Sequence, residues 1–286
     1  MTRMTRIILI LSIVLGACAA RKPEVNHSGP VFEDPDRDPY NFYRSDSLTL
    51  LRTQQFTEAI DTVRRMRKLH PSDAEPEYLM ARVHTGLQQF ELAERSLRLA
   101  LKMNPRYPEA LSQMGVLLDL QGNHSLARDF HRRAIALAPE QASYRNNLGF
   151  SLYLDKRYQE AISTFSKALE LDASARRVHN NLAFAFGRLG NMTRAYSEFR
   201  LAGVPAQASN NVGFLYEERG ELARAYDYYV TALQEDPELT QARRNLERVC
   251  VQLGRPLPDL PEPTPPPKPS SFEPPADPPT PPEPKS

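Results

Sequence analysis

The sequence predicts an all-α fold, an α-solenoid built from one helix-turn-helix unit that repeats along the chain. The first observation is a five-residue motif, Asn146-Asn147-Leu148-Gly149-Phe150, which returns in nearly the same form at 180–184 and at 210–214. The copies start 34 and then 30 residues apart, a period typical of two-helix repeats. Alanine recurs with the same period, and proline closes most of the periods.

Small residues and proline mark the two helices of each period. Small side chains let two antiparallel helices approach closely, and proline ends a helix because it lacks a backbone N–H donor. One position is alanine in six units, the position seven residues later is alanine in all but the first unit, and proline follows in four. These residues are Ala59, Ala93, Ala127, Ala161, Ala195 and Ala225, then Met66, Ala100, Ala134, Ala168, Ala202 and Ala232, then Pro71, Pro105, Pro139 and Pro237.

This pattern, with the Leu-Gly pair at 148–149, resembles the tetratricopeptide repeat. The resemblance implies a right-handed superhelix of about six units and a capping helix. The first unit has Asp46-Ser47 in place of Leu-Gly, which we interpret as the polar outer face of a terminal repeat. The fifth unit is short, so its second helix should end near Leu201 or Ala202. The expected units are 40–73, 74–107, 108–141, 142–175, 176–205 and 206–239, with the cap at 240–254.

The capping helix is predicted from its own apolar face. Ala242, Leu246, Val249 and Leu253 share one side of a helix that Gly254 should end. Cys250 lies on or beside that face, and we interpret it as a buried structural thiol.

The first 17 residues are predicted to be a signal peptide. A positive start with Arg3 and Arg6 precedes an apolar run at 7–15 that is too short to cross a bilayer. The end of this segment, Leu15-Gly16-Ala17-Cys18, resembles the bacterial lipobox, which implies a covalent lipid on Cys18. Because Ala19 follows rather than aspartate, the resemblance also implies the periplasmic face of the outer membrane. The alternative is an ordinary signal peptide in which Cys18 is incidental.

Two polar segments flank the repeats. Residues 18–39 contain four prolines and several aspartates, so they cannot bury enough surface to fold and are predicted to be a lipidated tether. Residues 255–286 are a Pro-rich tail, predicted to be disordered. The tail is either a spacer or a ligand for a groove lined by aromatic side chains.

The composition argues against several functions. A formal net charge of +1 is unlike the basic stripe of a nucleic-acid-binding protein. Two cysteines without neighbouring histidines give no metal or redox motif. Among the scattered histidines, His124 and His131 have no evident carboxylate partner. We therefore expect no enzyme activity, no small-molecule substrate, no metal and no cofactor other than the lipid on Cys18.

The repeated asparagines are the candidate peptide-binding residues. Each side-chain amide offers both a donor and an acceptor, so a row of them can pair with the backbone of an extended peptide. The resemblance implies that the position faces the concave groove. The alternative is that asparagine assists helix starts or contacts between neighbouring units. The residues are Asn147, Asn181, Asn211 and Asn245, preceded in three units by Asn146, Asn180 and Asn210.

Phenylalanine follows these asparagines in three units. Phe150, Phe184 and Phe214 stand three residues after an asparagine of the row, so they project from much the same helix face. A stripe of aromatics beside amides would bury side chains of a bound segment. The alternative is that these rings pack against the next unit.

The expected function follows from the anchor and the groove. The chain resembles tetratricopeptide lipoproteins that help secretin or pilus machines assemble, including tight-adherence pilus systems. The resemblance implies a periplasmic scaffold whose partner is a secretin or a pilus-assembly subunit. The alternative is an adaptor for envelope or cell-wall enzymes that works through its convex face or its Pro-rich tail.

Overall fold

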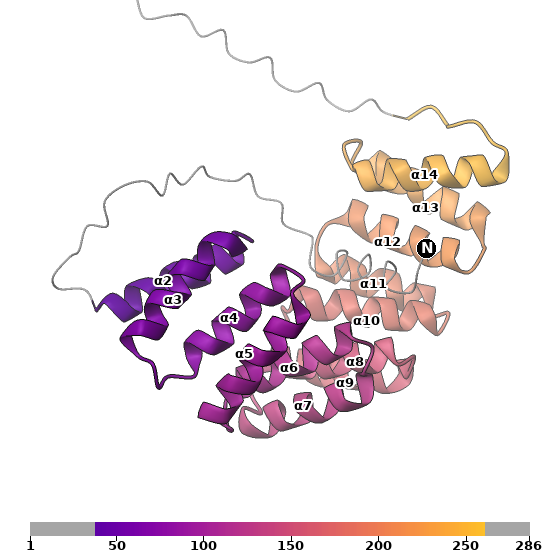
Figure 1. Ribbon diagram of the computed structural model, residues 1–286. Coiled ribbons are helices and arrows are strands. Elements are labelled where there is room, and N and C mark those ends of the chain that lie inside the picture. The colour runs from indigo at the N-terminus through magenta and orange to yellow at the C-terminus, as the bar shows by residue number, and fades with distance from the viewer. Residues whose placement is uncertain (1–37, 261–286) are drawn as a thin grey trace, which may run out of the picture.

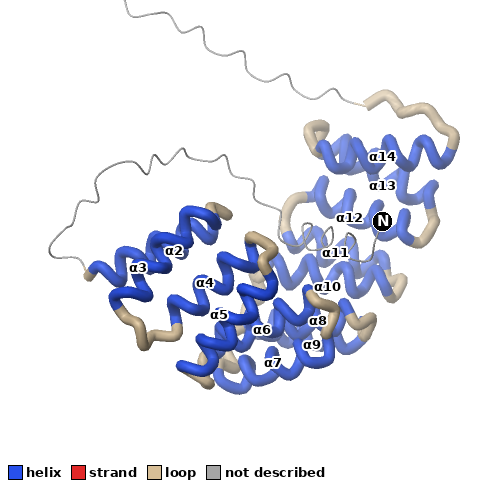
Figure 2. The backbone as a smooth tube through the Cα atoms, in the orientation of Figure 1, coloured by secondary structure: helices blue, strands red, loops and turns tan. Residues whose placement is uncertain are grey.

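The computed structural model describes residues 38–260, and within that range every regular element is an α-helix. Figures 1 and 2 show the helices stacked along a curved path from α2 to α14. The predicted signal peptide, the lipidated Cys18, most of the tether and the tail beyond residue 260 lie outside the described residues. The helices are α2 (Pro39–Arg52), α3 (Phe56–Leu69), α4 (Glu75–Gly86), α5 (Phe90–Met103), α6 (Pro108–Leu120), α7 (His124–Leu137), α8 (Ala142–Leu154), α9 (Tyr158–Leu171), α10 (Arg176–Arg188), α11 (Met192–Ala202), α12 (Pro205–Glu218), α13 (Leu222–Glu235) and α14 (Thr240–Leu253).

The helices form two layers. Each even-numbered helix packs against the odd-numbered helix that follows it, and these pairs stack one on the next. The even-numbered helices also contact one another along the stack, from α2 to α14, whereas odd-numbered helices of neighbouring pairs do not touch to a comparable extent. The surface made by α2, α4, α6, α8, α10, α12 and α14 is called the inner wall below. This architecture confirms the predicted all-α solenoid.

A small residue facing a large one holds each pair together. In α8, a Cβ atom added to Gly149 would lie 2.6 Å from the Phe165 ring of α9, so the ring packs directly on the helix backbone. Phe165 is fully buried, and burying a ring of this size contributes about 1.5–3 kcal/mol. Gly213 receives the Tyr229 ring of α13 in the same way. The Leu-Gly pair of the motif is therefore a helix-packing feature.

The first unit uses the same contact, which corrects one expectation. Ser47 was predicted to belong to a polar outer face, but its side chain is 0% exposed. Its hydroxyl donates to Thr62 Oγ1 of α3 at 2.7 Å and lies 3.7 Å from Met66 Sδ. The prediction was wrong because serine is small enough for the close approach and finds a hydrogen-bond partner across it.

The C-terminal helices end where the sequence analysis predicts. Helix α11 ends at Ala202, as the short fifth unit predicts, and α12 begins at Pro205. Gly254 adopts a left-handed conformation with φ of 64° directly after α14. Cys250 is buried, at 4% exposure, and burial raises the pKa of its thiol. No helix within residues 38–260 combines the length and the apolar character needed to cross a membrane.

Every unit turns between its two helices through one residue in the left-handed region. Three units place glycine there, with φ of 80° at Gly122, 83° at Gly190 and 77° at Gly220. The other units place Gln54, Gln88 and Lys156 there, with φ of 61°, 59° and 61°. A side chain in this conformation costs roughly 1–2 kcal/mol because Cβ crowds the backbone.

Replacing Lys156 by glycine is therefore expected to stabilise the chain. Relief of the backbone strain, reduced by the greater freedom of glycine in the unfolded chain, predicts a gain of about 0.5–1 kcal/mol. Thermal unfolding followed by circular dichroism measures it. The matched control is Gly122→Lys, which meets no neighbouring atom within 4 Å and should lower the melting temperature. A lower melting temperature for Lys156→Gly would contradict the account.

Candidate functional site

The predicted binding residues lie on four consecutive helices of the inner wall. Helices α8, α10 and α12 each carry an Asn-Asn pair in their first half, and α14 carries the last asparagine. Since these helices contact one another along the stack, the asparagines form a row that crosses from unit to unit.

The asparagines bond to one another in a staggered register. The Asn-Asn pair defines two neighbouring positions on each inner-wall helix. The asparagine at the second position donates its amide N–H to the side chain at the first position of the preceding inner-wall helix, which is Ser112 on α6 and asparagine on the others. We call these contacts the amide bridges. They run from Asn147 Nδ2 to Ser112 Oγ (3.0 Å), from Asn181 Nδ2 to Asn146 Oδ1 (2.8 Å), from Asn211 Nδ2 to Asn180 Oδ1 (3.4 Å) and from Asn245 Nδ2 to Asn210 Oδ1 (2.9 Å).

Two of these asparagines also accept hydrogen bonds through their side-chain carbonyl oxygens. Asn211 Oδ1 accepts from Gln207 Nε2 at 3.0 Å, and Asn245 Oδ1 accepts from Arg248 at 2.9 Å. The carbonyl oxygen of Asn181 is buried without a partner in the described part of the chain. Only Asn147 and Asn180 of the row are half-buried, while Asn146, Asn181, Asn210, Asn211 and Asn245 are buried. The structure thus shows contacts between neighbouring units, and peptide binding by these amides stays a prediction.

The three phenylalanines do not share one environment. Phe184 is 8% exposed and packs edge-on against Phe199 of α11, with ring centroids 4.9 Å apart. Phe150 lies parallel to Tyr153, with centroids 6.1 Å apart, and is half-buried, as is Phe214. Phe150 and Phe214 therefore keep part of their surface on the inner wall, whereas Phe184 is mostly in the core.

The inner wall has further apolar residues that the sequence analysis missed. Val116 stands at the position of Phe150 one unit earlier, and Leu120 and Leu154 stand one turn further along α6 and α8. All three are half-buried. Counting back one period from Phe150 would have found Val116. We call Val116, Phe150 and Phe214, together with Leu120 and Leu154, the apolar strip.

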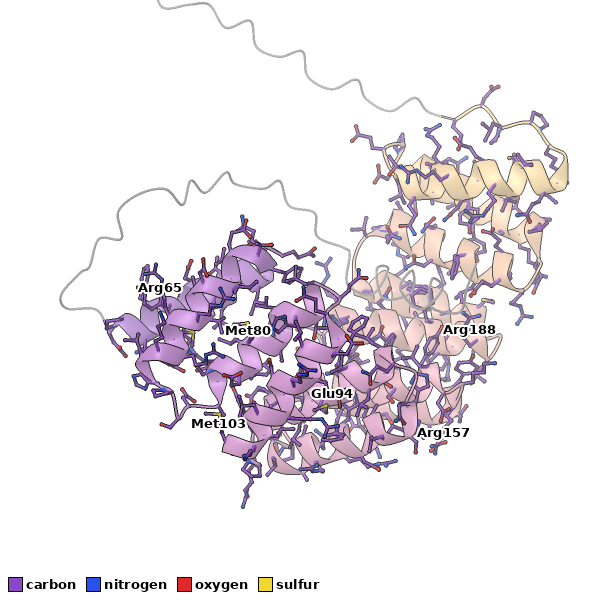
Figure 3. The ribbon with its side chains drawn as sticks, in the orientation of Figure 1. Arg65, Met80, Glu94, Met103, Arg157 and Arg188 are labelled. Atoms are coloured by element: carbon purple, nitrogen blue, oxygen red, sulfur yellow. The ribbon has the colours of Figure 1, made fainter. Side chains whose placement is uncertain are left out.

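Arginines near the strip are largely paired. Arg188 of α10 bonds to the Tyr153 hydroxyl at 3.1 Å and to Glu218 of α12 at 2.7 Å, so it joins three units. Arg157 forms a two-pronged pair with Glu160 on its own pair of helices. Figure 3 shows where Arg157 and Arg188 lie. Arg188 therefore links neighbouring units, whereas the exposed Arg157–Glu160 pair contributes little to stability. Burial raises the pKa of the Tyr153 hydroxyl.

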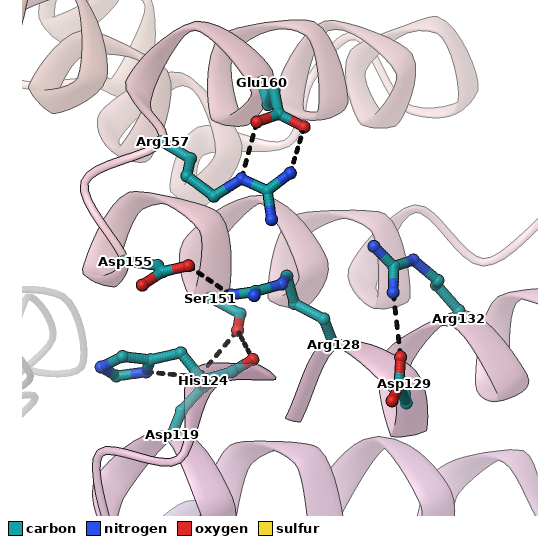
Figure 4. A network of polar contacts seen from close by, with 9 residues as sticks. All are labelled: Asp119, His124, Arg128, Asp129, Arg132, Ser151, Asp155, Arg157 and Glu160. Atoms are coloured by element: carbon teal, nitrogen blue, oxygen red, sulfur yellow. Dashed lines mark hydrogen bonds and ion pairs between the residues drawn. The ribbon is translucent and has the colours of Figure 1, made fainter. Parts of the chain in front are cut away.

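A buried polar network joins the third and fourth units (Figure 4). Asp119, at the end of α6, accepts from Ser151 Oγ at 2.8 Å and contacts His124 Nδ1 at 2.9 Å. The other carboxylate oxygen of Asp119 lies 3.3 Å from His131 Nε2. The expectation that these histidines lack a carboxylate partner was wrong, because the turn between α6 and α7 brings Asp119 to both.

The contact between Asp119 and His131 has a counterpart in the sixth unit, and the shared spacing could have predicted it from the sequence. Asp119 and His131 are 12 residues apart, and Glu217 accepts from the Tyr229 hydroxyl across the same separation in the sixth unit, at 2.7 Å. Ser151 donates to a carboxylate rather than to an imidazole, so the contacts do not activate it as a nucleophile. Within residues 38–260, no three His, Cys, Asp or Glu side chains are arranged to hold a metal ion.

Comparison with known proteins identifies the repeats. A family model described as tetratricopeptide repeat matches residues 78–142 and 129–176. Type IV pilus assembly protein PilF of Pseudomonas aeruginosa is 33% identical over 94 residues, covering 32% of this chain and 37% of PilF. Lipoprotein NlpI homolog of Haemophilus influenzae is 36% identical over 87 residues, covering 30% of this chain and 28% of the homolog. The chain thus matches well under two thirds of either relative.

Solved structures show the same fold. PilW, described as a widely conserved type IV pilus biogenesis factor, matches with a TM-score of 0.62 and 17% identity, over 73% of this chain and 99% of PilW. A structure of Pseudomonas aeruginosa PilF matches with a TM-score of 0.57 and 21% identity, over 73% of this chain and 97% of PilF. At these identities the likeness concerns the solenoid fold alone.

The amide bridges are expected to stabilise the stack. Asn181→Ala leaves Asn146 Oδ1 buried without its donor, which predicts a loss of about 1–3 kcal/mol in the free energy of unfolding. Asn146→Ala should cost a similar amount, and the double variant should lose less than the sum, with a coupling of about 0.5–1.5 kcal/mol. Urea unfolding of the four proteins measures the coupling. Strictly additive losses would show that the bridge contributes nothing.

Proposed function

We propose that this tetratricopeptide-repeat protein is a non-enzymatic scaffold, anchored through a lipid on Cys18 to the periplasmic face of the outer membrane. Its inner wall holds a segment of a partner protein and assists assembly of a pilus or secretion machine. The observation that carries the proposal is the apolar strip, where Val116, Phe150 and Phe214 keep part of their surface open on the inner wall.

The inner wall has the physical features of a protein-binding surface. Its apolar strip contains aromatic rings, which are enriched among the residues that dominate binding energy. The amide bridges fix neighbouring helices relative to one another, so little ordering is required when a segment docks. Phe150 and Phe214 are half-buried, so their rings are already held by the protein and lose little side-chain entropy when a segment binds.

The partner class is inferred from the relatives. PilF and PilW are described as factors of type IV pilus assembly and biogenesis, and this chain shares their solenoid fold. We therefore infer that the bound segment belongs to a secretin or to a pilus-assembly subunit. The match to a protein named a lipoprotein is in keeping with the lipobox-like residues that end at Cys18.

Photo-crosslinking from defined positions tests the inner wall. With benzoylphenylalanine in place of Phe150 or Phe214, we expect covalent capture of a secretin or pilus-assembly subunit in intact envelopes, because both rings lie on the proposed surface. Mass spectrometry of the adducts identifies the captured chain and the peptide that it contributes.

The matched control uses exposed positions on the outer layer. Leu99 of α5 and Leu126 of α7 are 43% and 42% exposed, and the same reagent there should capture far less of that subunit. Capture from Leu99 and Leu126 but not from Phe150 and Phe214 would contradict the proposal and favour an adaptor that works through its convex face.

The lipid anchor has a separate test. Cys18→Ser should move the protein from the membrane fraction to the soluble periplasmic fraction and abolish labelling with a palmitate analogue, because the proposed lipid binds the membrane with about 0.8 kcal/mol per buried methylene. Cys250→Ser is the control, since this thiol is buried on α14, and it should remain membrane-bound and labelled. Retention of Cys18→Ser in the membrane would refute the lipid anchor.

A further inference from the structure

A pocket lies at one edge of the solenoid, between the fifth and sixth units. Its volume is about 530 Å³, and it is formed by the turn between α10 and α11, the end of α12 and the start of α13. None of the residues of the apolar strip lines it. We call it the edge pocket, and the lining residues used below are Leu189, Gly190, Tyr216, Arg219, Glu221 and Arg224.

Tyrosine rings continue from the edge pocket to the outer layer. The Tyr216 ring of α12 stacks on Tyr228 of α13, with centroids 5.4 Å apart, and Tyr196 of α11 lies edge-on to Tyr228 at 6.1 Å. Tyr196 and Tyr228 are half-buried, so part of each ring stays accessible. We call Tyr196, Tyr216 and Tyr228 the tyrosine row.

The edge pocket carries an excess positive charge. Arg219 Nε and Arg224 Nη1 lie 2.7 and 2.9 Å from the two carboxylate oxygens of Glu221, so two guanidinium groups share one carboxylate. The other charged side chains of the two stretches that meet here, 186–196 and 214–228, leave this excess unchanged. Three of them form ion pairs and two are of opposite charge, namely Arg188, Glu217 and Glu218, then Arg194 and Asp227.

Both guanidinium groups are held at the pocket. Arg224 lies 5.5 Å from the centre of the Tyr216 ring. A Cβ atom on Gly190 would lie 3.1 Å from Arg219 Nη1, so glycine at this turn leaves room for the guanidinium. An arginine has five N–H donors, and Glu221 accepts from one nitrogen of each arginine. Both arginines therefore keep donors for a second carboxylate.

The chain leaves its last helix at the same edge. Consecutive helices are joined by short turns and pack side by side, so α10, α12 and α14 all end there. After α14, the Arg255 guanidinium lies 5.8 Å from the centre of the Tyr226 ring, near the start of α13. Leu260 packs against the apolar core of the C-terminal units. The residues that follow Leu260 therefore start close to the helices that form the edge pocket.

The composition of residues 261–286 matches the edge pocket. This segment has 13 prolines in 26 residues, and four acidic residues against two lysines. Proline-rich segments bind grooves lined by aromatic side chains, and carboxylates accept paired hydrogen bonds from guanidinium groups. A polyproline II segment of this length reaches about 80 Å, which is enough to bring it to the pocket. Each acidic residue adjoins a proline, and these residues are Glu262, Glu273, Asp277 and Glu283.

We propose that the edge pocket binds a segment of residues 261–286 of the same chain through one of its proline-flanked carboxylates. The carboxylate accepts hydrogen bonds from Arg219 and Arg224, which balances the charge of the pocket, and the adjoining prolines lie on the tyrosine row. The inference goes beyond the proposed function, since the pocket and the apolar strip share no residue. The tail is thereby held at the edge of the solenoid, and the inner wall stays free for a partner.

Photo-crosslinking within the full chain tests this site. With benzoylphenylalanine in place of Leu189, which is 49% exposed and lines the edge pocket, we expect a link to residues 261–286 in a product with the mass of a single chain. Mass spectrometry of the linked peptides identifies the captured residues. The same reagent at Leu99 of α5, which is 43% exposed, should capture the tail far less.

Charge variants test the contact that the proposal requires. Arg219→Gln with Arg224→Gln should lower capture from Leu189 about tenfold, because charge-assisted hydrogen bonds are lost. The matched control, Lys167→Gln with Arg244→Gln, removes two exposed charges outside the pocket and should capture the tail as the unaltered chain does. Circular dichroism spectra confirm that each variant is folded.

A variant of the tail leaves the helices unaltered. Neutralising its four acidic residues should lower capture from Leu189 as much as the pocket variant does, and the substitutions are Glu262→Gln, Glu273→Gln, Asp277→Asn and Glu283→Gln. The absence of a link from Leu189 to the tail, or equal capture by the pocket variant and its matched control, would overturn the inference. A tail link found only in a product of two chains would also overturn it, because the pocket would then hold the tail of a second copy.

Discussion

The inner wall depends on contacts between neighbouring units, because a two-helix unit cannot bury its apolar face alone. The amide bridges supply the polar part of these contacts. In the bridge from Asn181 to Asn146, both residues are buried. If one is removed, the other loses its hydrogen-bond partner and no water molecule replaces that partner. Repeating this bond from α8 to α14 sets the spacing of the helices, and the spacing in turn fixes the apolar strip.

The units of the inner wall differ in chemistry. Helices α6, α8 and α12 carry the apolar strip, whereas Phe184 of α10 is buried. The Asp119 network lies between units three and four and uses buried polar groups where other units use aromatic packing; His131 stands at the position that Phe165 occupies one unit later. Binding surfaces of this kind arise from the sequence of each unit while the backbone stays nearly constant.

The sequence was sufficient for the fold and for part of the site. Periodicity predicted the helices, the end of α11 and the buried thiol of Cys250, because these depend on local patterns. It did not predict which atom each asparagine bonds, since the register between units places Asn181 against Asn146 rather than against Asn147. Phe184 differs from Phe150 because Phe199 covers its ring, and the carboxylate partner of His131 is brought close only by the turn after α6.

Hydrogen exchange of the chain in complex with the solubilised secretin of the same host tests the central claim most directly. If the inner wall holds the partner, exchange should slow in peptides from α6, α8 and α12, while peptides from α7, α9 and α13 should exchange as in the free chain. Slower exchange confined to the outer helices or to residues after 254, in a complex of demonstrated stoichiometry, would contradict the claim.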